Sequence, residues 1–111
     1  MHLKNVSLYS PNETDIRLTP AYDLISAAII NPKDDEELAL TLNGRKKKLK
    51  KADFIKAAEA VGMETIIMER LIAKYIKLLP TFEAAIKGSF LNQELKEKFI
   101  ELLKERSQRL V

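Results

Sequence analysis

Apolar and polar residues alternate with a period of two in the segments 6–10 and 15–19. This period is typical of half-buried strands. Between the two segments lies Ser10-Pro11-Asn12-Glu13-Thr14, in which proline presets φ and Asn12 can bond to its own backbone. The pattern therefore predicts a β-hairpin, whose second strand ends at Pro20 because proline cannot donate a ladder hydrogen bond.

A second alternation occurs at Leu38, Leu40 and Leu42 and leads directly to Asn43-Gly44. Asn-Gly is the strongest short-range hairpin signal, so we expect a second hairpin here with a short, charged return strand. The apolar residues 24–30 fit either a strand or a helix.

From residue 51 onwards the apolar positions recur at intervals of three and four, as in amphipathic helices. Gly62 is typical of a helix C-terminus, Pro80 must end or kink a helix near Leu79, and Asn92 is a good N-cap. The expected helices are 53–62, 64–79, the short piece 82–87, and a last one from residue 92.

Each long helix carries an apolar face. These faces comprise Phe54, Ile55, Ala58 and Val61; Ile67, Leu71, Tyr75 and Leu78; and Leu95, Phe99, Leu102 and Leu103. We expect a single α+β domain over residues 1–111, mainly helical. A hairpin segment, 1–50, with one or two β-hairpins is followed by a three- to four-helix bundle, 51–111.

The composition excludes several kinds of site. There is no cysteine, which rules out disulfides and thiolate metal sites, and one histidine is too few for a His-rich zinc site. The longest unbroken apolar run is Ala27–Ile30, and the first residues lack the pattern of a signal peptide. We therefore expect a cytoplasmic protein that does not bind membranes.

The net charge of +3 is unevenly distributed. Six basic residues in the segment 45–51 contribute +6, so the remaining residues sum to −3. This basic run fits either a nucleic-acid contact or a charged edge that prevents aggregation. We favour the second interpretation and do not expect direct nucleic-acid binding.

Two oxygen-bearing side chains, Asn5 and Asp23, are each nine residues from position 14, near the expected turn. A hairpin centred there would bring them together, and an amide oxygen with a carboxylate suits Mg²⁺. The alternative is that both residues are ordinary turn or helix caps.

Two segments carry a family resemblance. Residues 2–8 read His-Leu-Lys-Asn-Val-Ser-Leu, and residues 17–26 read Arg-Leu-Thr-Pro-Ala-Tyr-Asp-Leu-Ile-Ser. Together they resemble the HipA family of bacterial serine/threonine kinases, in which Asp-x-His-x-Lys-Asn leads through a hairpin to Leu-Thr-Pro-x-Tyr-Asp. Residues 37–50 resemble the next hairpin of that family, and the helical remainder is compatible with it.

The resemblance implies roles for four residues. Asn5 matches the metal-binding asparagine of the catalytic loop, and Asp23 matches the magnesium aspartate. His2 and Lys4 match loop residues close to the nucleotide phosphates. The implied cofactors of the full-length family are Mg²⁺ and ATP, and the implied partners are an N-terminal kinase lobe and a DNA-binding antitoxin.

The chain also departs from the family pattern. The catalytic-base aspartate would stand immediately before Met1, and the glycine-rich loop and the lysine of the small lobe would lie further upstream. The glycines present, Gly44, Gly62 and Gly88, cannot form a GxGxxG loop. We therefore expect a fragment of the kinase large lobe that is inactive alone and holds no cofactor when isolated.

Two alternatives from another functional class stay open. Residues 58–70 faintly resemble helix-turn-helix spacing, which would make the chain a small DNA-binding domain. The chain could instead be a partner subunit of a split kinase. A fragment would also expose apolar faces, so a homo-oligomer is a further expectation.

Overall fold

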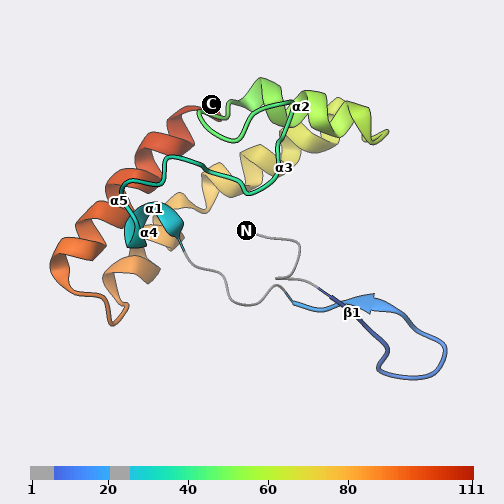
Figure 1. The fold of residues 1–111 in the computed structure, drawn as a ribbon, viewed down its shortest axis with the longest axis horizontal. Coiled ribbons are helices and arrows are strands. Elements are labelled where there is room, and N and C mark those ends of the chain that lie inside the picture. The colour runs from blue at the N-terminus through green and yellow to red at the C-terminus, as the bar shows by residue number, and fades with distance from the viewer. Residues whose placement is uncertain (1–6, 21–25) are drawn as a thin grey trace.

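A computed structural model of the chain describes residues 7–20 and 26–111 (Figure 1). Two short strands come first and are followed by helices. The elements are β1 (Leu8–Tyr9), β2 (Arg17–Leu18), α1 (Ala27–Ile30), α2 (Lys51–Ala60), α3 (Thr65–Lys77), α4 (Leu79–Lys87) and α5 (Gln93–Gln108). The prediction of a mainly helical α+β fold with an N-terminal hairpin is confirmed.

The hairpin is antiparallel, with Leu8 opposite Leu18 and Tyr9 opposite Arg17. Beyond the strands, the backbone N–H of Thr19 donates to the Ser7 carbonyl at 2.8 Å, and the Ser7 N–H donates to the Thr19 hydroxyl at 3.0 Å. The pairing centres on residue 13, one position earlier than we inferred from spacing.

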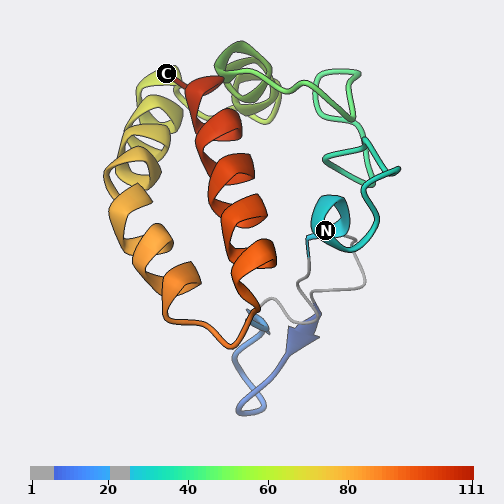
Figure 2. The ribbon, with the colours of Figure 1, turned by 90° about the vertical axis from the view of Figure 1, so that its left-hand side faces the viewer.

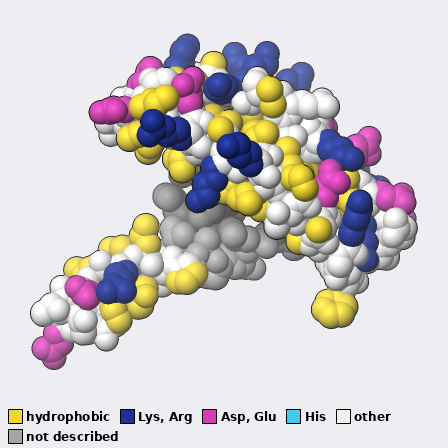
Figure 3. All heavy atoms as spheres, turned by 180° about the vertical axis from the view of Figure 1, so that it is seen from behind, with side chains coloured by type: hydrophobic (Ala, Val, Ile, Leu, Met, Phe, Trp, Pro, Cys, Tyr) yellow, Lys and Arg dark blue, Asp and Glu magenta, His cyan; other side chains and the backbone are white. Residues whose placement is uncertain are grey.

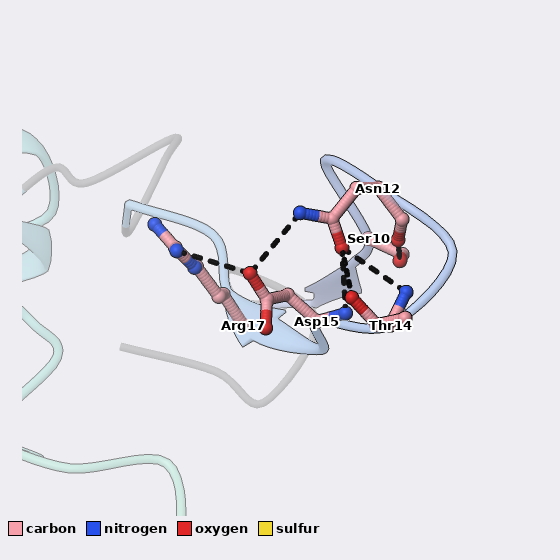
Figure 4. A network of polar contacts seen from close by, with 5 residues as sticks. All are labelled: Ser10, Asn12, Thr14, Asp15 and Arg17. Atoms are coloured by element: carbon pink, nitrogen blue, oxygen red, sulfur yellow. Dashed lines mark hydrogen bonds and ion pairs between the residues drawn. The ribbon is translucent and has the colours of Figure 1, made fainter.

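The side chain of Asn12 determines where this hairpin turns (Figure 4). Its Oδ1 accepts hydrogen bonds from the backbone N–H groups of Thr14 and Asp15, at 3.0 and 2.8 Å. Its Nδ2 donates to Asp15 Oδ2 at 3.2 Å, and Arg17 donates to the same oxygen at 3.3 Å. The Ser10 hydroxyl donates to the Asn12 carbonyl. The turn is thus closed locally by polar contacts, as Asx turns are.

Of the second predicted hairpin, only the turn forms. Asn43 and Gly44 both have positive φ, 50° and 74°, as a type I′ turn requires. Leu42 and Arg45 exchange backbone hydrogen bonds of 2.8 and 3.0 Å across them.

The strands expected on either side of that turn are absent from the described residues 36–50, so that prediction is wrong. The N–H groups of Glu37 and Leu38 both donate to the Lys46 carbonyl, at 2.7 and 3.2 Å. Because the Lys46 carbonyl accepts from both of these N–H groups, the regular series of hydrogen bonds between two paired strands does not form here. Lys48, with φ of 53°, then turns the chain towards α2.

Helix α2 ends in a Schellman motif. Gly62 has φ of +81°, and its N–H donates to the Glu59 carbonyl at 3.0 Å, while the Met63 N–H donates to the Ala58 carbonyl at 2.9 Å. The predicted glycine stop is confirmed. Val61, which we placed on the apolar face, is instead 79% exposed because it lies at the point where the chain leaves the helix.

The later helix boundaries also follow local signals. Helix α3 ends at Lys77, and α4 begins at Leu79 with Pro80 in its first turn, where a missing N–H costs nothing. Helix α4 therefore starts three residues earlier than the predicted Phe82. Before α5, Asn92 Oδ1 accepts from the Leu95 N–H at 2.9 Å, which confirms the predicted N-cap.

Helices α3 and α4 follow one another along one side of α5, with α2 packed on α3 and α1 against α5 (Figure 2). The buried apolar residues in the described part are few: Leu49, Ala58 and Ile72. The radius of gyration is 16.1 Å, against about 13 Å for a compact chain of this length. No helix in the described segments is long and apolar enough to cross a bilayer.

Asp53 is the buried polar residue of this core, at 5% exposure. Its Oδ1 accepts from the Asn43 side chain at 2.9 Å, and its Oδ2 accepts from the Lys50 backbone N–H at 2.9 Å. These hydrogen bonds, Asn43's first, hold the pKa of Asp53 below its ordinary value. One carboxylate therefore caps α2 and fixes the Asn-Gly turn against it.

We expect Asp53→Ala to lower the melting temperature by roughly 5 °C, because the start of α2 and the turn lose their shared acceptor. Thermal unfolding followed by circular dichroism measures this. The control is Lys56→Ala on the exposed side of the same helix, which should change the melting temperature little. Equal effects of the two substitutions would contradict the role of Asp53.

Candidate functional site

The four residues predicted for the site, His2, Lys4, Asn5 and Asp23, lie outside the described residues. Their geometry therefore stays a prediction. The nearest described structure in sequence is the Ser7–Thr19 pair, two residues after Asn5 and four before Asp23. The hairpin that separates the two predicted ligands in sequence is thus in place, with its register fixed up to that pair.

Residues 7–20 and 26–111 contain no cluster of three or more His, Cys, Asp or Glu side chains suited to a metal ion. Asp35 and Glu36, in the middle of the acidic run 34–37, are solvent-exposed loop residues instead, whereas Glu37 is largely buried. Within this run, Asp34 Oδ1 accepts from the Glu36 backbone N–H at 3.0 Å, an Asx turn that points no oxygen at a common centre.

Much of the basic run 45–51 is paired with carboxylates. The pairs are Lys46–Glu36 at 3.7 Å, Lys47–Asp35 at 2.5 Å and Lys51–Glu69 at 3.8 Å. The Lys47 hydrogen bond lowers the pKa of Asp35 and, reciprocally, raises that of Lys47. Two of the six basic residues, Lys46 and Lys47, thus pair with the chain's own acidic loop, which is more in keeping with the charged-edge interpretation than with a nucleic-acid surface.

Glu37 is the most heavily engaged carboxylate in the described structure. Arg109 Nη1 donates to its Oε1 at 2.6 Å, and the backbone N–H groups of Lys48 and Leu49 donate to Oε1 and Oε2 at 3.2 and 3.1 Å. The Glu37 and Arg109 side chains are only 13% and 21% exposed. Burial alone would raise the pKa of Glu37, but the Arg109 hydrogen bond, the Leu49 N–H and the nearby guanidinium charges outweigh it and lower that pKa.

Arg109 connects three segments at this point. Besides Glu37, its guanidinium pairs with Glu105 at 3.3 Å, and its carbonyl accepts from the Lys51 N–H at 3.1 Å. The end of α5 is therefore joined to the loop 34–49 and to the first residue of α2. Sequence reasoning missed this contact because the two residues are 72 positions apart and no local pattern links them.

A comparison with protein families bears on the N-terminal motifs. The sequence model of the HipA-like C-terminal domain matches residues 1–81, nearly three-quarters of the chain. The chain belongs to the HipA-like C-terminal domain family. No curated protein matches the chain.

The HipA-like match covers the predicted site residues and extends through α3 into the start of α4. It confirms the resemblance that residues 2–26 suggested. The rest of α4 and all of α5, which provides Arg109, lie beyond it.

We expect Glu37→Ala to reduce the free energy of unfolding by about 1–3 kcal/mol, because three donors lose a charged, largely buried acceptor. Urea unfolding monitored by circular dichroism measures the loss. The control is Glu94→Ala, which breaks the exposed Glu94–Lys98 pair of 3.0 Å on α5 and should cost less than about 0.5 kcal/mol. Similar losses in both variants would show that Glu37 contributes no more than a surface charge.

The acid dependence of stability tests the same residue. A depressed folded-state pKa means that the contribution of Glu37 is complete above its ordinary value of 4.5 and is lost as the pH falls through the lower folded-state value. We expect the stability of Glu37→Gln to fall less steeply than that of the wild type in this acid range. Parallel curves for the two proteins would contradict the depressed pKa.

Proposed function

We propose that the chain is the C-terminal part of the large lobe of a cytoplasmic HipA-like serine/threonine kinase. In this proposal it supplies Mg²⁺ ligands to an ATP site that a separate lobe completes. The observation that supports it is the family match over residues 1–81. This match includes Asn5, which precedes the β1–β2 hairpin in sequence, and Asp23, which follows it.

The chemistry of the donors fits this role. An amide oxygen and a carboxylate are hard ligands, and Mg²⁺ usually takes its other ligands from water and phosphate. When bound, the metal would neutralise charge on the phosphates, which is the main requirement of phosphoryl transfer. Asn5 and Asp23 would hold it, while His2 and Lys4 would lie near the phosphates and the transferred group.

The β1–β2 hairpin orients the two segments that lead to the proposed ligands. The Asn12 turn and the Ser7–Thr19 pair define one register, so the segments that lead to Asn5 and to Asp23 leave the hairpin at the same end. A fixed register is what a metal site needs when its ligands come from both strands.

The 111 residues contain neither the catalytic-base aspartate of the family loop nor a glycine-rich phosphate loop. We therefore propose that the chain alone does not turn over ATP. The small lobe and the catalytic base would complete the site. Lys46 and Lys47 pair with the chain's own carboxylates, which gives the DNA-binding alternative less support.

The test is Mg·ATP binding by isothermal titration, with the chain alone and after mixing with a purified small-lobe polypeptide of a HipA-like kinase. We expect binding only in the mixture. Asp23→Ala and Asn5→Ala should each weaken it by at least about tenfold, the size of one lost charged or metal-directed interaction. The control Glu13→Ala changes an exposed residue in the turn of the same hairpin and should leave binding unchanged.

Two results would contradict the proposal. One is ATP turnover by the chain alone. The other is nucleotide binding in the mixture that is unaffected by Asp23→Ala.

A further inference from the structure

A groove between α4 and α5, which we call the α4–α5 groove, combines an apolar lining with a single cation. It has a volume of about 420 Å³ and is open to solvent. Its apolar lining residues are Phe82, Ala85 and Ile86 of α4 and Phe99, Leu102 and Leu103 of α5. Its polar lining residues are Ser26, just before α1, and Arg106 of α5, and none of these described residues is acidic. Figure 3 shows one face of the helical body, where hydrophobic side chains are exposed beside Lys and Arg residues.

The cation lies at one end of the lining along α5. The lining residues of this helix follow Phe99 by three, four and seven positions, so they share one face of α5. At 1.5 Å per residue, Arg106 is about 10 Å along the helix axis from Phe99. Helix α4 lies beside α5 (Figure 2), and the groove runs between the two helices. A long apolar groove with a cation at one end fits a long apolar molecule that carries one negative charge at its end.

The charge of Arg106 has no ion-pair partner among the described residues, whereas Arg109, three positions later, pairs with Glu37 and Glu105. The Nε of Arg106 is also buried without a hydrogen-bond partner. Buried polar groups in proteins are nearly always hydrogen-bonded, and an unpaired one calls for an explanation such as a ligand or an ion.

Arg106 also borders a polar cavity of about 470 Å³ next to the groove. The charged residues that line this cavity are the acidic Asp34, Asp35, Glu37 and Glu105 and the basic Lys47, Lys48, Lys50, Arg106 and Arg109. Asp35 pairs with Lys47, and the two glutamates both pair with Arg109. The cations outnumber the carboxylates by one, so this cavity does not neutralise Arg106.

We propose that the α4–α5 groove binds an amphipathic carboxylate, a molecule with a linear hydrocarbon chain and one carboxylate at its end. The hydrocarbon chain lies between α4 and α5, where each methylene that leaves water contributes to affinity. Arg106 donates charge-assisted hydrogen bonds to the carboxylate oxygens, and the Ser26 hydroxyl provides a second donor. One cation in the groove matches a single negative charge, and the volume lies within the roughly 300–1,000 Å³ of small-molecule sites.

This site is separate from the predicted metal site. Almost all of its lining lies beyond residue 81, where the HipA-like match ends. Binding of a carboxylate here requires neither Mg²⁺ nor ATP, so this proposal and the kinase proposal can fail independently.

Isothermal titration of the full chain with decanoate tests the proposal. We expect saturable binding at one site, weakened by at least about fivefold for octanoate, which has two fewer methylenes to bury. Decyltrimethylammonium has a chain of the same length and the opposite charge, and it should bind at least about tenfold more weakly than decanoate. Absence of saturable decanoate binding, or equal affinity for the two decyl compounds, would overturn the proposal.

A charge substitution tests the role of Arg106. Arg106→Gln should weaken decanoate binding by at least about tenfold, because the carboxylate loses its charged donor, whereas Arg106→Lys should retain most of the affinity. The matched control is Lys104→Gln, which removes the same charge from an exposed residue of α5 outside the groove and should leave the affinity unchanged. Equal losses in Arg106→Gln and Lys104→Gln would mean that the effect is one of net charge, contrary to the proposal.

A bulky substitution tests the place of the hydrocarbon chain. Ala85→Trp puts an indole into the groove and should abolish decanoate binding. Ala84→Trp adds the same side chain at the neighbouring exposed residue of α4, which does not line the groove, and should leave binding intact. Circular dichroism confirms that both variants are folded. Decanoate binding that survives in Ala85→Trp would place the ligand elsewhere and overturn the proposal.

Discussion

The ion pair between Glu37 and Arg109 is the constraint on which the arrangement of the described structure depends most. Its two side chains are largely removed from solvent, so an unpaired partner would be a buried charge, which proteins rarely tolerate. Glu37 also accepts from two consecutive backbone N–H groups, at Lys48 and Leu49. A single carboxylate therefore fixes the chain just before α2 and attaches it to the end of α5.

This connection matters because the apolar core is small. Only Leu49, Ala58 and Ile72 are buried among the apolar residues described, and Leu49 is the residue whose N–H bonds to Glu37. Helix caps and hydrogen bonds to carboxylates therefore hold together segments that a larger apolar core would hold in other proteins. The same scarcity of burial leaves the apolar side chains of Ile67, Leu71 and Tyr75 on α3 exposed to solvent.

The sequence predicted well those features whose causes are local. The turns at Asn12 and Asn43-Gly44, the glycine end of α2 and the Asn92 cap each depend on residues within a few positions. The strands beside Asn43-Gly44 were predicted wrongly, because local alternation cannot show that Lys46 serves as acceptor for two donors. Which side of α3 is covered, and the contact of Glu37 with Arg109, depend on segments far apart in the sequence. The spacing of apolar residues does not predict such contacts.

For the candidate site, the sequence motif was the main source of information, and the family match supports it over the same residues. The position of the hairpin centre was inferred one residue too late. Counting from the middle of a turn cannot anticipate that the Asn12 side chain binds Thr14 and Asp15 and closes the turn around residue 13. Moving the centre by one position shifts the partner of every residue by two positions, so spacing alone is a weak guide to a pair of ligands.

The long sequence separation between Glu37 and Arg109 also has a consequence for folding during synthesis. The loop 34–49 leaves the ribosome well before α5, so its main side-chain anchor does not exist while most of the helices are being made. Until the last turn of α5 emerges, Glu37 is an unpaired acidic residue beside a highly basic segment. The loop therefore acquires its native position late, and α2, α3 and α4 must form without it.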